Sequence, residues 1–150
     1  MGPLKLGIAG LGNVGCGLID LVQRQEKLRL PGRVSVTGVT ARSRNRNRPV
    51  DISPFDWFDD ASELAAHDNV DVFVELIGGS DGPAKVAVET ALKAGKPVIT
   101  ANKALIAEHG LALASLAEEQ GVDLLFEAAV AGGIPAVSYT HLTLPTKRIV

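Results

Sequence analysis

The sequence predicts a single α/β domain built on an open, doubly wound parallel sheet. Short apolar runs alternate with segments of helical periodicity through most of the chain. The run at residues 70–77 is almost continuously apolar, which is typical of a central parallel strand covered by helices on both faces. Repeated alternation of strand and helix predicts crossover connections within one parallel sheet.

The elements of the N-terminal half follow from local patterns. Residues 4–9 form an apolar run that predicts a buried strand, and apolar residues then recur at helical spacing over 13–28. The β-branched run at 34–40 predicts a second strand. Residues 42–54 are polar and contain two prolines, which indicates a loop. Residues 60–66 begin with a capping aspartate and predict a short helix.

The C-terminal half continues the same alternation. The strand at 70–77 ends at two glycines, and a proline opens the helix expected over 83–94. Residues 97–100 predict a fourth strand. A long amphipathic helix is expected over 103–120, with a glycine at 110 as a candidate break, and residues 122–126 predict a fifth strand.

Composition excludes several classes of function. The chain has 150 residues, a formal net charge of −2 and a pI near 5.9, which argue against nucleic-acid and anionic-membrane partners. A single cysteine cannot form an internal disulfide, which fits a reducing compartment and a cytoplasmic location. No uncharged apolar run approaches the ~18 residues that a membrane helix needs. Composition therefore removes these classes without naming a function.

The first motif lies between the first strand and the first helix and has the form G-x-G-x-x-G. Gly10 permits the tight turn, Gly12 lets the backbone approach a pyrophosphate, and Gly15 allows the helix to pack closely on the strand. Asn13 and Val14 stand at the helix N-terminus, whose unpaired N–H groups and partial positive charge suit phosphates. In this context the motif predicts a Rossmann-like dinucleotide site, with a plain glycine-rich turn as the alternative.

The end of the second strand selects between cofactors in this fold. An acid there often holds the ribose 2′-hydroxyl of NAD, but this chain has none at that place. Arg42 could instead pair with the 2′-phosphate of NADP, and Ser43 could donate to it. We interpret Arg44, Arg46 and Arg48 as a solvated basic loop. We therefore expect NADP, and the missing acid does not exclude NAD.

Two further strand ends carry candidate ligand-binding groups. Gly78 and Gly79 follow the third predicted strand, where a backbone without side chains can lie close to a ligand, although a plain strand-to-helix turn explains them equally well. Lys103 follows the fourth predicted strand. A partly desolvated lysine there could orient a carbonyl oxygen or donate a proton, with an exposed helix-start lysine as the alternative.

The segment at 127–135 combines small residues with a Gly-Gly-Ile-Pro step, which indicates a tight loop that opens another helix. Its main-chain carbonyls could ligate a hard cation. The histidines at 67, 109 and 141 lack ligand-like spacing, so we expect no zinc site. Cys16 lies inside the first helix and is interpreted as a packed small residue.

Together these motifs resemble the N-terminal part of homoserine dehydrogenase. The resemblance covers about residues 4–136. It rests on Gly-Leu-Gly-Asn-Val-Gly at 10–15, Glu-Leu-Ile-Gly-Gly at 75–79, Thr-Ala-Asn-Lys at 100–103 and Glu-Ala-Ala-Val-Ala-Gly-Gly-Ile-Pro at 127–135. The family interconverts L-homoserine and L-aspartate 4-semialdehyde with NAD(P), on the route to threonine, methionine and isoleucine.

The resemblance implies roles for individual residues. Asn13, Val14 and Arg42 would contact the cofactor, and Lys103 would be the catalytic lysine beside nicotinamide and substrate. The family's sodium site uses largely main-chain oxygens. It maps to the four residues Glu127, Val130, Gly132 and Ile134.

The resemblance also divides the chain. Residues 1–136 are expected to be the NAD(P)-binding domain, and residues 137–150, which show no helical apolar period, are expected to be a non-native or disordered tail. In the family a substrate and dimerisation domain follows, so we expect a homo-oligomeric full-length enzyme that acts on a small molecule. The isolated chain should bind NADP(H) weakly and have negligible turnover. Two other functions stay open: another NAD(P)-dependent dehydrogenase, and a non-catalytic nucleotide-binding module.

Overall fold

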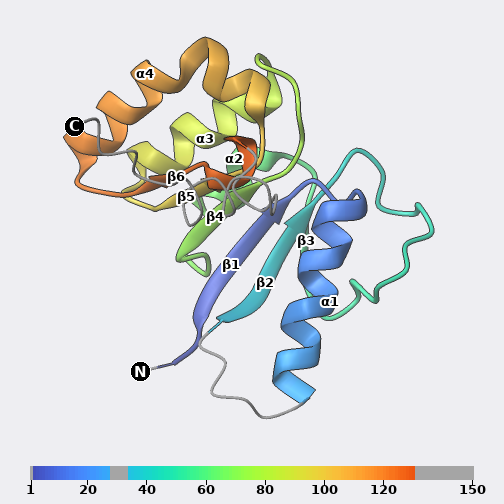
Figure 1. Cartoon of the computed structure of the whole chain (residues 1–150). Helices are drawn as coiled ribbons and strands as arrows, with labels where there is room; N and C mark the ends of the chain where they lie inside the picture. The colour runs from blue at the N-terminus through green and yellow to red at the C-terminus, as the bar shows by residue number, and fades with distance from the viewer. Residues whose placement is uncertain (1, 28–33, 131–150) are drawn as a thin grey trace, which may run out of the picture.

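The computed structural model describes residues 2–27 and 34–130 of the chain. Its strands are β1 (Leu4–Ala9), β2 (Val34–Thr40), β3 (Asp56–Phe58), β4 (Val72–Glu75), β5 (Val98–Thr100) and β6 (Leu124–Leu125). They form one parallel sheet in the order β3-β2-β1-β4-β5-β6 (Figure 1). The order reverses direction between β1 and β4, as in a doubly wound nucleotide-binding fold. The predicted fold class is confirmed.

Helices cover both faces of this sheet. They are α1 (Asn13–Lys27), α2 (Ala61–Ala66), α3 (Pro83–Lys93) and α4 (Lys103–Gln120), and a 3₁₀ turn, η1 (Glu127–Val130), follows β6. One apolar cluster packs α1 against β1, β2 and β4, and Cys16 belongs to it as a buried side chain. A second cluster packs α2, α3 and α4 on the opposite face, as the separation of these helices from α1 in Figure 1 shows. Two cores on two faces are what a right-handed series of crossovers produces.

The register of the sheet positions the site. Ala9 pairs with Thr40 on one side and with Glu75 on the other, and Glu75 pairs with Thr100. The carboxyl ends of β1, β2, β4 and β5 are therefore level with one another. The turns that leave these four strands start at one edge of the sheet, at the point where the strand order reverses.

Three details differ from the sequence-based expectations. β3 was not predicted, because Asp56–Phe58 is only a three-residue segment without clear alternation and is a strand only because it pairs with the edge of β2. α4 continues through Gly110, so the candidate break was wrong; the helix surrounds that glycine on both sides. β4 and β6 are shorter than the apolar runs at 70–77 and 122–126, because apolar residues beyond each ladder pack without strand pairing.

Within the described ranges, none of the helices has both the length and the apolar character needed to cross a membrane.

Candidate functional site

The turn between β1 and α1 is built around its glycines. Gly10 has a φ of 106°, and a Cβ on it would lie 2.3 Å from the carbonyl oxygen of Leu76. A Cβ on Gly15 would lie 2.0 Å from the carbonyl oxygen of Gly10. The Gly10 N–H donates to Thr40 O at 2.9 Å, which ties the turn to β2. Both glycines are therefore required by close backbone approach, as the sequence pattern predicts.

Gly12 is different from these two glycines. It is exposed, and a Cβ built on it would have no atom of the described chain within 4 Å. Packing within residues 2–27 and 34–130 therefore does not require glycine here. A bare backbone facing open space is what a closely approaching ligand needs, so Gly12 fits the role of pyrophosphate contact.

The start of α1 offers donors beside Gly12. The first helical hydrogen bond runs from Cys16 N–H to Gly12 O at 2.9 Å, so the N–H groups of Asn13, Val14 and Gly15 have no carbonyl within the helix to bind. The first turn of α1 contains no acidic residue that would compete for them. The 15-residue helix also directs the positive end of its dipole here. This helix start suits a phosphate group.

A surface cavity of about 530 Å³ lies beside this helix start, within the usual size range of ligand sites. Its walls come from the glycine turn, the outer face of α1 and the loop that follows β2. The lining residues are Leu11, Gly12, Asn13, Cys16, Gly17, Asp20, Arg24, Arg46, Asn47, Arg48, Pro49 and Val50. The cavity thus has glycine backbone on one side and arginine side chains on the other, a polar combination suited to an anionic ligand.

The basic loop is more ordered than its sequence suggested. Arg48 donates to the main-chain oxygens of Ser43, Arg44 and Arg46, and its guanidinium lies 5.8 Å from the centre of the Trp57 ring. Arg48 is half-buried, and its side chain cross-links the backbone of the loop, a role that the interpretation as a solvated basic loop did not include. Arg44 and Arg46 are exposed, as expected.

Arg42 lies two residues beyond β2 and is exposed. Its segment leaves the sheet at the same edge as the glycine turn, since Thr40 pairs with Ala9. The structure therefore places Arg42 on the strand end that the fold uses for the adenosine ribose.

The carboxyl ends of β4 and β5 are joined by a buried polar network that sequence reasoning missed. Glu75 is fully buried and accepts hydrogen bonds at Oε1 from the N–H groups of Ile77 (2.7 Å) and Gly78 (3.1 Å). Its Oε2 accepts from the Thr100 hydroxyl at 2.5 Å. The Nδ2 of Asn102, which is also buried, lies 3.5 Å from Glu75 Oε1. The available sequence signal was an acid closing an otherwise apolar strand.

Lys103 is exposed and is the first residue of α4. Asn102 precedes it as the N-cap of the helix, and its Oδ1 accepts from Leu105 N–H at 3.1 Å. The same side chain donates through Nδ2 to Gly79 O at 2.6 Å. Gly78 and Gly79 both have a φ of 85°, so this turn adopts the left-handed backbone that glycine permits. The fold thus brings the predicted lysine next to the predicted glycine turn.

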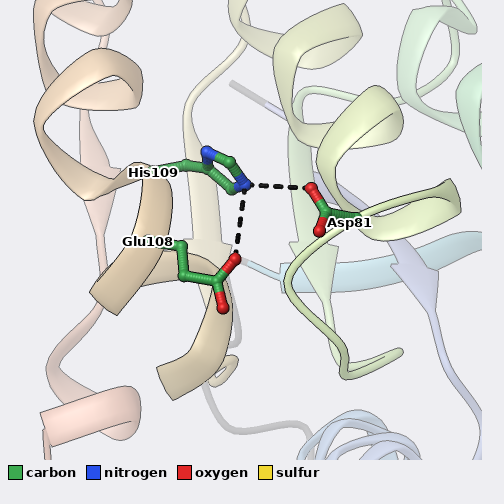
Figure 2. Close-up of side chains that lie close together, drawn as sticks. All are labelled: Asp81, Glu108 and His109. Carbon is green, nitrogen blue, oxygen red and sulfur yellow. Dashed lines mark hydrogen bonds and ion pairs between the residues drawn. The ribbon is translucent and has the colours of Figure 1, made fainter.

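A second contact joins the same turn to α4. His109 on α4 points toward Asp81, which lies just ahead of α3, and the carboxylate of Glu108 points toward His109 (Figure 2). His109 Nε2 is 3.1 Å from Asp81 Oδ1 and 3.9 Å from Glu108 Oε2. Spacing along the chain gave no sign of this group, because Asp81 comes from another element. Asp81 and Glu108 are mostly exposed, and we treat the group as a contact between the loop and the helix.

Of the four candidate sodium ligands, two lie in the described part of the chain. Glu127 and Val130 are the first and last residues of η1, and both are exposed. Gly132 and Ile134 lie outside the described residues, as does the segment 137–150.

Comparison with known proteins gives a consistent result. The family model described as "Homoserine dehydrogenase, NAD binding domain" matches residues 10–127. The chain is 43% identical over 155 residues to homoserine dehydrogenase of Pseudomonas aeruginosa, covering 99% of this chain and 34% of that protein. It is 42% identical over 147 residues to the Corynebacterium glutamicum enzyme, covering 96% and 33%. The chain spans about a third of the length of the curated relatives it matches.

Solved structures agree with this family assignment. A crystal structure of Staphylococcus aureus homoserine dehydrogenase at pH 8.5 superposes with a TM-score of 0.77 at 37% identity, covering 87% of this chain and 33% of that one. The enzyme from Thiobacillus denitrificans gives a TM-score of 0.79 at 32% identity, covering 93% and 33%. A hyperthermophilic archaeal homoserine dehydrogenase in complex with NADPH shares the fold at 21% identity, with a TM-score of 0.72 and coverage of 91% and 47%.

Proposed function

Because the chain belongs to the NAD-binding domain family of homoserine dehydrogenases, we propose that it is the nucleotide-binding part of an enzyme that interconverts L-homoserine and L-aspartate 4-semialdehyde. The observation that carries this proposal is the glycine turn. Gly10 and Gly15 are held against neighbouring backbone, whereas a Cβ on Gly12, at a helix start, would meet no atom of the described residues within 4 Å. A pyrophosphate that lies against this bare backbone would explain a glycine at position 12.

Different residues of this chain are proposed to bind the cofactor and to act on the substrate. When bound, the cofactor supplies a hydride that passes between its nicotinamide and the aldehyde carbon. The first turn of α1 holds the pyrophosphate through main-chain N–H groups, with Asn13 and Val14 in contact with the cofactor. The Gly78–Gly79 turn supports its nicotinamide half. Lys103, at the start of α4, orients the carbonyl oxygen of the substrate and donates or holds its proton.

We propose NADP as the preferred form of the cofactor. Arg42 is exposed beyond the end of β2, where a guanidinium can pair with a 2′-phosphate. The strand end offers no carboxylate for the 2′-hydroxyl of NAD. Arg46 and Arg48 add positive charge to the wall of the neighbouring cavity.

We also propose a sodium site at η1. Hard cations take oxygen ligands, and the main-chain carbonyls of Glu127 and Val130 sit at the two ends of an exposed 3₁₀ turn, so the donor chemistry fits. Gly132 and Ile134 would complete the set. Thermal unfolding of the chain in NaCl and in KCl at equal ionic strength tests this; a Tm equal in both salts contradicts it.

Apolar side chains near the last strand support a larger enzyme. Leu125 ends β6, Phe126 follows it, and Val130 ends η1; their exposed fractions are 47%, 39% and 57%. We propose that the substrate domain of the whole enzyme covers them, that the enzyme is a homo-oligomer, and that it acts in the cytoplasm.

The proposal is tested in two steps. First, the 150-residue chain is titrated with NADPH and NADH, with fluorescence or calorimetry as the readout; binding of either supports a nucleotide-binding domain, and binding of neither refutes it. Second, the chain is joined to the C-terminal two-thirds of the Pseudomonas aeruginosa relative, and homoserine-dependent reduction of NADP⁺ is measured with and without Lys103→Ala. A fusion that binds NADPH but does not reduce NADP⁺ in the presence of homoserine favours the non-catalytic module.

A further inference from the structure

The turn after β4 and the start of α4 are joined by one continuous hydrogen-bond network. We propose that Glu75 and Asn102 are positioning residues that hold the Gly78–Gly79 turn and Lys103 in a fixed relation to each other. This inference rests on the proposed function, because the turn and the lysine are its cofactor and substrate contacts. Neither Glu75 nor Asn102 is expected to touch the substrate.

Glu75 provides the first link. It is fully buried among apolar strand residues, where a carboxylate costs far more than an apolar side chain of similar volume. Its two oxygens bind groups on both sides: the N–H groups of Ile77 and Gly78 at the start of the turn, and the Thr100 hydroxyl at the end of β5. An apolar residue could fill the same space without directing the turn. We therefore infer that Glu75 serves to orient the turn.

Asn102 provides the second link. Its backbone N–H donates to Thr100 Oγ1 at 3.0 Å, which extends the network from Glu75 through β5. Its Oδ1 caps α4, and its Nδ2 donates to Gly79 O at 2.6 Å. The side chain thus binds the helix and the turn at once. Since Lys103 is the next residue and begins the helix, the direction of its side chain depends on this cap.

The turn itself explains why such links are needed. Gly78 and Gly79 both have a left-handed backbone, and glycine has the largest conformational freedom of any residue. The turn is held at its start by Glu75, at its middle by Asn102, and at its end by the contact between Asp81 and His109 in Figure 2. Two of these three holds lead to α4, the helix that carries Lys103.

The test separates capping from positioning. Asn102→Ser keeps an N-cap acceptor for α4 but removes the Nδ2 donors to Gly79 and Glu75. The matched control is Asp60→Ser at the N-cap of α2, where, among the described residues, the side chain accepts from Ser62 N–H alone. Both variants of the 150-residue chain are compared by thermal unfolding and by NADPH titration. We expect similar Tm values, with an NADPH affinity about five- to tenfold lower for Asn102→Ser only.

A second variant and a spectroscopic readout make the result specific. Glu75→Gln retains an acceptor for Ile77 and Gly78 N–H but loses the charge, so its loss of affinity should be smaller. In a double variant the two losses should not add, because both residues act through one network. At saturating NADPH, the nicotinamide emission maximum of Asn102→Ser should shift in the same direction as that of Lys103→Ala.

The outcomes are distinguishable. If the parent chain does not bind NADPH, the proposed function itself fails. If the parent binds and Asn102→Ser binds equally well, only the positioning role is overturned. It is also overturned if affinity and Tm fall in parallel in both network variants, since the network would then act on stability alone.

Discussion

Gly12→Ala should separate cofactor binding from folding. A Cβ at position 12 meets no atom of the described chain within 4 Å, and the residue is not in the left-handed region. The substitution therefore adds neither a clash nor backbone strain. Alanine also restricts the backbone conformations of the unfolded chain more than glycine does, so the free energy of unfolding should stay level or rise by up to about 1 kcal/mol.

The same methyl group should weaken the cofactor complex. The pyrophosphate is expected to lie against the bare backbone of Gly12, and a methyl there must displace it or the turn. Overpacking of a fitted contact costs about 1–3 kcal/mol. At 1.4 kcal/mol per tenfold change, the NADPH dissociation constant should rise by about 5- to 150-fold.

The assay compares three proteins: the parent chain, Gly12→Ala and Gly110→Ala. Gly110 lies within α4, where a Cβ would come 3.3 Å from Ile106 Cγ2, so this variant controls for the effect on cofactor affinity of a methyl added elsewhere. NADPH titration gives the affinities, and circular dichroism on heating gives the Tm values. An unchanged affinity for Gly12→Ala would refute the site. A fall in Tm by more than a few degrees would refute the claim that position 12 is open.

Three further predictions concern Gly15, Arg42 and Lys96. Gly15→Ala should lower the free energy of unfolding by about 1–3 kcal/mol, because its Cβ would lie 2.0 Å from Gly10 O. The control is Gly17→Ala, exposed within α1 with no neighbour in the described chain within 4 Å, which should raise the free energy of unfolding by about 0.5–1 kcal/mol. Denaturant unfolding measures both changes. Arg42→Ala should weaken NADPH binding by up to about 2 kcal/mol and leave NADH unchanged; equal losses for the two cofactors would exclude contact with the 2′-phosphate. Burial lowers the pKa of Lys96, although the charges of Asp68 and Asp71 oppose the shift, so the unfolded chain keeps this proton to higher pH than the folded chain. The free energy of unfolding should therefore rise with pH between the lowered pKa and the ordinary lysine value. Lys96→Arg stays charged over this range and should lose that rise in denaturant unfolding measured at several pH values.

Local patterns were enough for most elements of the fold. Helical spacing and capping residues gave α1 to α4 within a few residues, because these features act between neighbours in the chain. The strand β3 was missed because its three residues carry no periodic signal and become a strand only by pairing with β2. α4 runs through Gly110 because one glycine costs a helix interior only about 1 kcal/mol, less than the packing of the flanking turns provides.

The candidate site divides in the same way. The packing roles of Gly10 and Gly15 could be predicted because their spacing within one turn has a direct physical meaning, and the contact of Gly12 with a pyrophosphate stays a prediction. Arg48 could not, since its hydrogen bonds and its contact with Trp57 depend on how the loop folds back. The roles of Arg42, Lys103 and the residues of the sodium site stay predictions.

The sequence by itself determined the class of fold and marked the turns at which we expect a dinucleotide to bind. Apolar periodicity set the alternation of strands and helices, and glycines after strand ends marked the turns, because both depend on residues close together in the chain. Only the tertiary structure decided which of these turns meet. The parallel order of the sheet aligns Glu75 with Thr100, 25 residues later, and brings Asn102 to the Gly79 turn and His109 to Asp81. These contacts depend on strand register, which is set by packing across the whole domain.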